Sequence, residues 1–193
     1  MPKTLAPRIR DCAPPPPPQE GKLQQVIAFS LFGPSTGEGW QSRYGDGALS
    51  NALLMPIVFP GWRMWVYHDD TVPHALLASL TKQPHVTLLN MSSRAAQLPN
   101  PRSWRFLVAS DPRVGRWLLR DIDSRLIARD KAAIDEWIAS GRRFSVMRDH
   151  PGQAAYPINA GMWGGTRDAL PCLSAMMHDQ AAGLNAMLDH LKL

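Results

Sequence analysis

The chain has 193 residues, which is enough for one well-packed domain and short for two. Its apolar fraction of 45% and charged fraction of 19% indicate a soluble globular protein. The net charge of +5 comes mostly from arginine, which favours phosphate or carboxylate ligands, and no basic run interleaved with aromatic residues indicates a nucleic-acid partner.

The positions of the cysteines and the hydropathy of the chain indicate where in the cell the protein is expected. Cys12 and Cys172 lie far apart in the sequence, so we expect neither a disulfide framework nor a zinc site. No apolar run reaches the roughly 18 residues that a transmembrane segment needs. The basic N-terminus is not followed by the apolar segment of a secretory signal. These observations predict a cytoplasmic location.

The first residues differ in composition from the rest. Residues 1–22 are rich in proline, with five consecutive prolines at 14–18, which favours polyproline II. We expect a disordered extension there and a single folded domain over 23–193.

Within that domain, strands alternate with helices. Short apolar runs bounded by polar, Gly or Pro residues predict strands within residues 23–33, 62–70, 85–91, 114–123, 143–150 and 158–165. Apolar residues at helical spacing predict helices at 48–59, 72–82, 103–111, 130–140 and 170–192. The Gly- and Ser-rich segment 33–47 is expected to be a loop. Such alternation predicts an α/β sandwich of three layers (α/β/α, Rossmann-like) with a mostly parallel sheet.

Polar clusters follow three of the predicted strands. They are His68-Asp69-Asp70, Asp121-Ile122-Asp123 and Arg148-Asp149-His150. Ligands of parallel α/β sheets bind outside the carboxyl ends of the strands. The three clusters therefore indicate a binding site at one edge of the sheet.

The pair Asp121 and Asp123 is the strongest candidate for a metal site. In an extended segment, residues two apart point to the same side, so both carboxylates can face one cation. Mg²⁺ and Mn²⁺ prefer oxygen ligands and bind through one or two carboxylates together with substrate phosphates. An Asp pair is also common in polar turns, and the spacing alone leaves both interpretations open.

Several other residues have two interpretations each. Arg120 and Arg125 are either phosphate ligands or ion-pair partners of the aspartates. Arg105 is either a nucleotide contact or a solvated residue beside core aromatics. Asp149 and His150 are the best acid/base candidates, because histidine titrates near neutrality and a carboxylate can accept the proton of a sugar hydroxyl. A polar turn before Pro151 is the alternative for that pair.

The order of several segments resembles a family of glycosyltransferase-like proteins with the GT-A fold. The segments are VIAFSLFG, YGDGALSNA, WRFLVASDP, RDIDSRL, AIDEWIASG, MRDHP and GMWG, from about Val26 to Gly165. The resemblance implies a nucleotide-sugar-binding α/β domain and a metal-dependent transfer of sugar from a nucleoside-diphosphate donor to a glycan or other saccharide acceptor.

The resemblance also implies roles for individual residues. Asp121 and Asp123 look like the D-x-D pair that binds Mn²⁺ or Mg²⁺ and, through the cation, the donor diphosphate. Six residues are expected to contact or line the donor site alongside that pair, and two are expected on the acceptor or catalytic side. The donor-site residues are Phe29, Ser30, Leu31, Arg105 and, as phosphate ligands, Arg120 with Arg125; the catalytic-side residues are Asp149 and His150.

Only 28 residues follow Gly165, whereas members of this family continue further. The resemblance therefore predicts a domain that is incomplete at its C-terminus, and a non-catalytic nucleotide-sugar-binding protein of the same fold is the alternative function. A phosphatase of the haloacid-dehalogenase type also uses D-x-D at a strand end. It is discounted, because its pair follows the first strand, whereas Asp121 and Asp123 follow the fourth.

Overall fold

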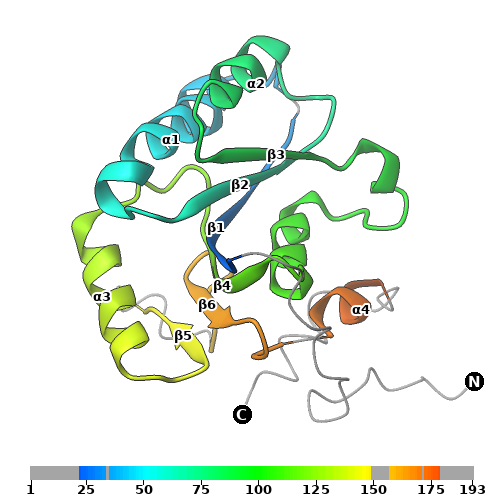
Figure 1. The fold of residues 1–193 in the computed structure, drawn as a ribbon. Coiled ribbons are helices and arrows are strands. Elements are labelled where there is room, and N and C mark those ends of the chain that lie inside the picture. The colour runs from blue at the N-terminus through cyan, green and yellow to red at the C-terminus, as the bar shows by residue number, and fades with distance from the viewer. Residues whose placement is uncertain (1–21, 34, 149–156, 171, 179–193) are drawn as a thin grey trace, which may run out of the picture.

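A computed structural model describes residues 22–33, 35–148, 157–170 and 172–178. These residues form one six-stranded sheet with helices on both faces (Figure 1). The strands are β1 (Gln24–Leu31), β2 (Arg63–His68), β3 (Val86–Asn90), β4 (Val114–Leu119), β5 (Phe144–Val146) and β6 (Trp163–Thr166). The helices are α1 (Asp46–Val58), α2 (His74–Thr81), α3 (Ala128–Ala139) and α4 (Leu173–His178), with a π-helical turn η2 (Gln41–Gly45) and 3₁₀ segments η3 (Ser92–Arg94) and η4 (Pro101–Ser110).

The strand order is β3-β2-β1-β4-β6-β5, and the sheet is mixed but mostly parallel. The first four strands in this order run parallel, whereas β6 is antiparallel to both β4 and β5. The chain thus moves outward from β1 to β3 and then crosses to β4 on the other side of β1. This reversal lies between β1 and β4, where parallel α/β sheets open a crevice for ligands.

Alternating side chains of β1 face opposite layers. Ile27, Phe29 and Leu31 pack toward α1, and Val26 and Ala28 pack toward η4, all fully or almost fully buried. Burial on both faces explains why β1 is a continuous apolar run rather than an alternating one.

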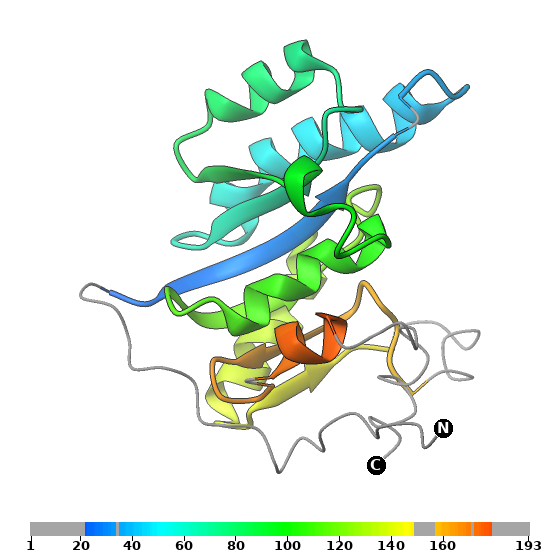
Figure 2. The same cartoon turned by 90° about the vertical axis from the view of Figure 1, so that its right-hand side faces the viewer.

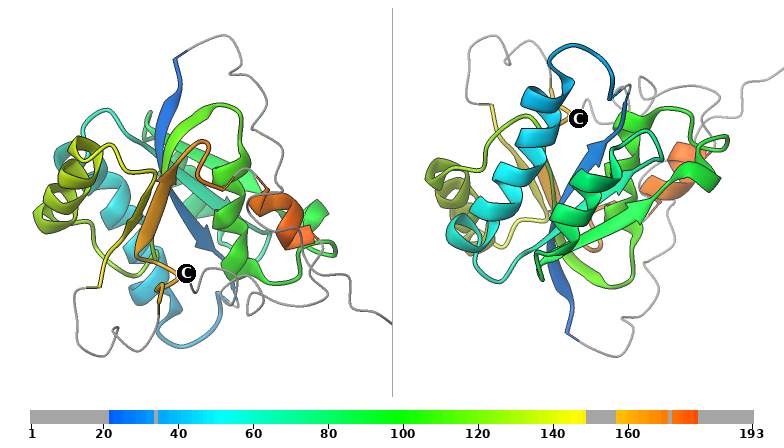
Figure 3. Two further views of the ribbon diagram at one scale, coloured as in Figure 1. Left: turned by 90° about the horizontal axis from the view of Figure 1, so that it is seen from below. Right: turned by 90° about the horizontal axis from the view of Figure 1, so that it is seen from above.

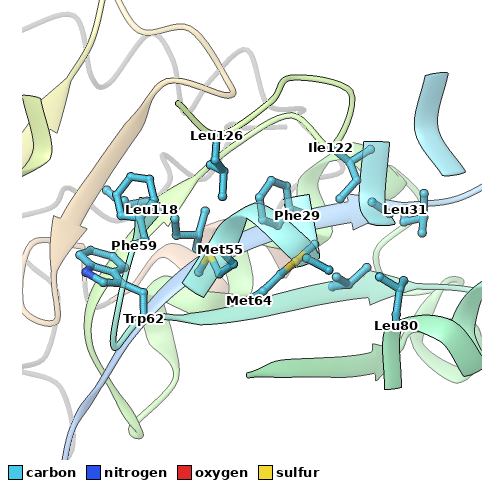
Figure 4. Packing of buried hydrophobic residues seen from close by; sticks show 14 of the residues in the cluster. Phe29, Leu31, Met55, Phe59, Trp62, Met64, Leu80, Leu118, Ile122 and Leu126 are labelled. Carbon is cyan, nitrogen blue, oxygen red and sulfur yellow. The ribbon is translucent and has the colours of Figure 1, made fainter. Parts of the chain in front are cut away.

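Both cores combine aliphatic and aromatic side chains. The core between the sheet and α1, α2 and α3 holds Phe29, Phe59 and Trp62 and is shown from close by in Figure 4. In the core between the sheet and η4 with α4, Trp117 meets Trp163 edge to face at 5.1 Å between ring centroids. The views in Figures 2 and 3 show η4 and α4 together on one side of β1 and α1 with α2 on the other. The predicted α/β sandwich with a mostly parallel sheet is confirmed.

The end of α1 and the start of α3 can be explained by residues in their terminal turns. Helix α1 continues through Pro56 and ends at Val58, so Pro56 lies in the last turn instead of ending the helix earlier. Helix α3 begins before Asp130, which lies in the first turn and accepts a hydrogen bond from the backbone N–H of Ile127 at 3.4 Å. Asp130 is therefore a first-turn acceptor and not the residue that precedes the helix.

The helix predicted over 103–111 is present as the 3₁₀ segment η4, which ends at Ser110. Two local predictions are wrong. Segment 33–47, expected to be a loop, contains η2, which runs directly into α1. Cys172 is disulfide-bonded although no disulfide was expected, since separation along the sequence does not limit distance in the fold. Of the terminal helix expected over 170–192, the described part is α4.

Candidate functional site at the carboxyl ends of β1 and β4

A cavity of about 450 Å³ opens where the strand order reverses between β1 and β4. Its wall contains the residues that end β1, part of the segment leading into α1, the first half of η4 and the turn that follows β4. The lining residues are Ser30, Leu31, Phe32, Gly33, Trp40, Arg43, Tyr44, Arg102, Arg105, Asp121, Ile122 and Asp123. This volume is in the range of small-molecule sites.

Both aspartates of the pair line this cavity, but by a different geometry from the one expected. Strand β4 ends at Leu119, and the backbone N–H of Ser124 donates to the carbonyl of Asp121 at 3.1 Å. The pair therefore lies in a tight turn and not in an extended strand. Ile122 between them is buried in the core and anchors the turn to the sheet.

A buried asparagine from α1 fixes this turn. The side-chain amide of Asn51 donates to the carbonyls of Ile122 at 3.0 Å and Ser124 at 2.9 Å, and its Oδ1 accepts from the N–H of Leu126 at 3.0 Å. Gly47, one turn earlier on α1, lies against the same backbone, because a Cβ there would come within 2.5 Å of the Ile122 carbonyl. The first half of α1 thus sets the position of the aspartate turn.

Asp121 is held by a buried arginine. Nη1 of Arg105 donates to Oδ1 of Asp121 at 2.6 Å and to the carbonyl of Arg120 at 2.8 Å. The Arg105 side chain is only 7% exposed, whereas that of Asp121 is 50% exposed. The backbone N–H of Arg105 donates to Oγ of Ser30 at 3.1 Å, which connects η4 to the end of β1. Nε of Arg105 is buried without a hydrogen-bond partner.

Asp123 is paired with an arginine that the sequence analysis missed. Nε of Arg43 in η2 donates to Oδ2 of Asp123 at 2.7 Å, and this hydrogen bond raises the pKa of Arg43. The Arg43 guanidinium also lies 5.3 Å from the ring centroid of Tyr44. Beside it, Trp40 is anchored by an indole hydrogen bond of 2.8 Å to the carbonyl of Phe32.

Arg102, at the start of η4, also lines the cavity and was missed. Its side chain forms no hydrogen bond or ion pair with the described residues, and the residue is exposed. The cavity therefore contains three arginines and two aspartates and carries a formal charge of +1. The sequence feature that could have identified Arg43 and Tyr44 as site residues is the stretch GWQSRY. It contains two aromatic residues and an arginine within a segment otherwise rich in glycine and serine.

The other residues predicted to bind the donor are dispersed. Ser30 and Leu31 line the cavity, whereas Phe29 faces the core under α1 (Figure 4). Arg120 is 2% exposed and turned away, with Nη2 at 3.6 Å from Oδ1 of Asp130. Arg125 is exposed and donates to the carbonyl of Asp123 at 3.1 Å, without lining the cavity.

A glycine leaves the space that the Asp121 carboxylate occupies. Gly161 is buried in the turn before β6, and a Cβ at this position would lie 2.6 Å from Cγ of Asp121. The first glycine of the GMWG segment therefore lies against a carboxylate of the cavity, so a larger residue at this position would displace Asp121.

The two remaining polar clusters do not extend the cavity within the described residues. After β2, Asp69 accepts hydrogen bonds from Thr71, and Asp70 accepts one from Asn90 at 2.9 Å, so both stabilise their own loop. His68 is buried, with its ring 3.2 Å from the carbonyl of Asp69. Asp149 and His150 lie outside the described residues.

Among the described residues, no three acidic, histidine or cysteine side chains come together as a metal site. Asp121 and Asp123 each keep one carboxylate oxygen that is not in the ion pair with arginine. Two carboxylate oxygens do not suffice for a cation held by protein alone, because Mg²⁺ and Mn²⁺ take about six oxygen ligands.

No protein-family model matches the chain, and no curated protein matches it. None of the helices in the described ranges has the length and apolarity to cross a bilayer.

Proposed function

We propose that the cavity binds a nucleoside-diphosphate sugar and that the chain is a metal-dependent glycosyltransferase of GT-A-like fold. One observation carries this proposal. The D-x-D turn, three arginines and three aromatic residues meet in one cavity at the reversal of strand order. Each of these groups matches one part of such a donor.

The arginines match the diphosphate. Guanidinium groups bind phosphate oxygens through paired N–H donors, and the single excess positive charge of the cavity favours an anionic ligand. Arg102 has no partner among the described residues, and Arg43 is an exposed side chain that can exchange Asp123 for phosphate. Tyr44 and Trp40, which lie 6.3 Å apart between ring centroids, offer an aromatic wall for the base or the sugar.

Asp121 and Asp123 would hold Mn²⁺ or Mg²⁺ through their unpaired oxygens. A cation there supplies charge neutralisation for the departing diphosphate. In the transfer, the bond between the anomeric carbon and the phosphate oxygen breaks, a bond to the acceptor oxygen forms, and the acceptor proton passes to a base. Asp149 and His150 remain the proposed acid/base residues.

A non-catalytic nucleotide-sugar-binding protein is the second candidate. It is favoured by the ion pairs that engage both aspartates and by the lack of a third acidic or histidine ligand in the described part of the chain. Such a protein would bind the donor without splitting it.

Calorimetry with a panel of nucleoside diphosphates, followed by a donor-hydrolysis assay, tests both candidates. We expect Arg102→Gln to weaken nucleotide binding by about tenfold, as for one charge-assisted contact, and Arg142→Gln, a solvent-exposed arginine far from the cavity, to leave it unchanged. Binding together with hydrolysis of one donor sugar supports the enzyme. Binding without hydrolysis or transfer supports the binding protein, and equal effects of the two substitutions contradict the assignment of the cavity.

A further inference from the structure

A second cavity, also of about 450 Å³, lies on the sheet face that η4 and α4 cover, toward the edge strand β3. It shares no lining residue with the cavity at β1 and β4. Its phenolic and charged groups come from β2, η3 and the segment between η4 and β4: Tyr67, Arg94, Asp111 and Arg113.

Tyr67 is the feature that indicates a ligand. The residue is 4% exposed, and its hydroxyl forms no hydrogen bond with any described residue. The hydroxyl is not among the described polar atoms that are buried without a partner, so it opens onto the cavity, where it can donate to water or to a ligand. Burial raises the pKa of Tyr67, and the charge of Asp111 adds to this effect, so the phenol keeps its proton and is a donor at neutral pH. The cavity therefore offers one hydrogen bond to an acceptor that is not part of the described protein.

The charges around Tyr67 sum to one positive charge. Arg113 donates to both oxygens of Asp111, at 2.9 and 2.8 Å, and lies 4.6 Å from the ring centroid of Trp65, so this pair is neutral and fixed in place. Arg94 is exposed, and its side chain forms no ion pair or hydrogen bond with the described residues. Arg94 and Tyr67 both line the cavity.

The remaining wall has an apolar part, which consists of Leu88, Leu89, Met91 and Leu107. The other lining residues are Asn90, Ser110, Pro112 and Ser174. A donor hydroxyl beside an uncompensated guanidinium selects an anionic oxygen, and the apolar wall selects a hydrocarbon portion attached to it.

We propose that this cavity is a second binding site, which takes a small amphiphile with an anionic oxygen head group, either a carboxylate or a phosphate monoester. The head group accepts the Tyr67 hydrogen bond and pairs with Arg94, while the hydrocarbon portion lies on Leu89, Met91 and Leu107. The site does not depend on the donor cavity or on catalysis.

The test is a titration of the ¹⁵N-labelled full chain with hexanoate and with hexyl phosphate, followed by NMR. Hexanol and inorganic phosphate are the controls for each half of the ligand. We expect saturable shifts at the amides of Asn90, Met91 and Leu107 with hexanoate, hexyl phosphate or both, and the stronger of the two identifies the head group.

Two variants and one matched control complete the design. Tyr67→Phe removes only the unpaired hydroxyl, and Arg94→Gln removes an exposed charge, so both are expected to fold with unchanged spectra elsewhere. We expect each to weaken binding by about tenfold, as for one lost charge-assisted hydrogen bond, while Arg142→Gln has no effect. Binding of hexanol equal to that of hexanoate, shifts that persist in both variants, or no saturable shift with either anion would overturn the proposal.

Discussion

Asn51 is expected to be the residue on which the geometry of the aspartate turn depends most. Replacing it with alanine removes three buried hydrogen bonds, to the carbonyls of Ile122 and Ser124 and from the N–H of Leu126. At a net value of about 1 kcal/mol for each bond, the loss in free energy of unfolding is about 3 kcal/mol. For a domain of this size that corresponds to a decrease in melting temperature of about 6–12 °C.

The measurement is urea and thermal unfolding of Asn51→Ala beside Ser50→Ala. Ser50 precedes Asn51 on α1 and forms no side-chain hydrogen bond in the described residues, so its substitution controls for changes in the helix itself. Amide hydrogen exchange at Leu126 and Ser124 should accelerate in the Asn51 variant alone. If Asn51→Ala costs less than about 1 kcal/mol, or if the exchange rates stay unchanged, Asn51 does not hold the turn and the reasoning is refuted.

Two further predictions concern the same edge of the sheet. Gly161→Ala should push the Asp121 carboxylate out of its present position. We expect this change to lower the free energy of unfolding by about 1–3 kcal/mol and to weaken cation-dependent nucleotide binding. Ala160→Ser, at the exposed residue before Gly161, should change neither quantity. Nucleotide binding that survives Gly161→Ala would show that Asp121 is not required where it lies. Hydrogen bonds, chiefly from Asn90, hold the pKa of Asp70 in the folded protein below its usual value. Ionised Asp70 therefore stabilises the fold above its unfolded pKa of about 3.9. This contribution is lost as the pH falls through the pKa of Asp70 in the folded protein. Urea midpoints of Asp70→Asn should therefore depend less on pH than those of the wild type below about pH 4, and parallel profiles would contradict the linkage.

The sequence was sufficient to predict the strands and the position of Asp121 in the candidate cavity. Apolar runs marked the strands, and the polar cluster after β4 placed Asp121 at the carboxyl edge of the sheet, where it lines the cavity. Ser30, which also lines the cavity, was expected there only from the resemblance. The strand order and the antiparallel direction of β6 were not predictable, because the same apolar run serves either direction.

Side-chain direction was the main source of error within the site. Arg120 and Asp121 are adjacent, yet one is buried toward Asp130 and the other faces the cavity. The turn that produces this divergence depends on Asn51, some 70 residues earlier. Arg43 was missed for a similar reason, since its direction depends on η2, a turn that follows the buried Trp40 within a segment rich in glycine and serine.

The most direct test of the proposed function is calorimetric titration of the chain with nucleoside diphosphates, with and without Mn²⁺, for the wild type and for Asp123→Asn. Asp123 is chosen because its partner Arg43 is 65% exposed, so the substitution leaves no buried charge unpaired, as Asp121→Asn would with Arg105. The account predicts that Mn²⁺ alone binds weakly, that it strengthens the binding of one nucleoside diphosphate, and that Asp123→Asn abolishes this strengthening. Nucleotide binding that is absent, or that is the same with and without Mn²⁺ in both proteins, would contradict the metal–diphosphate site.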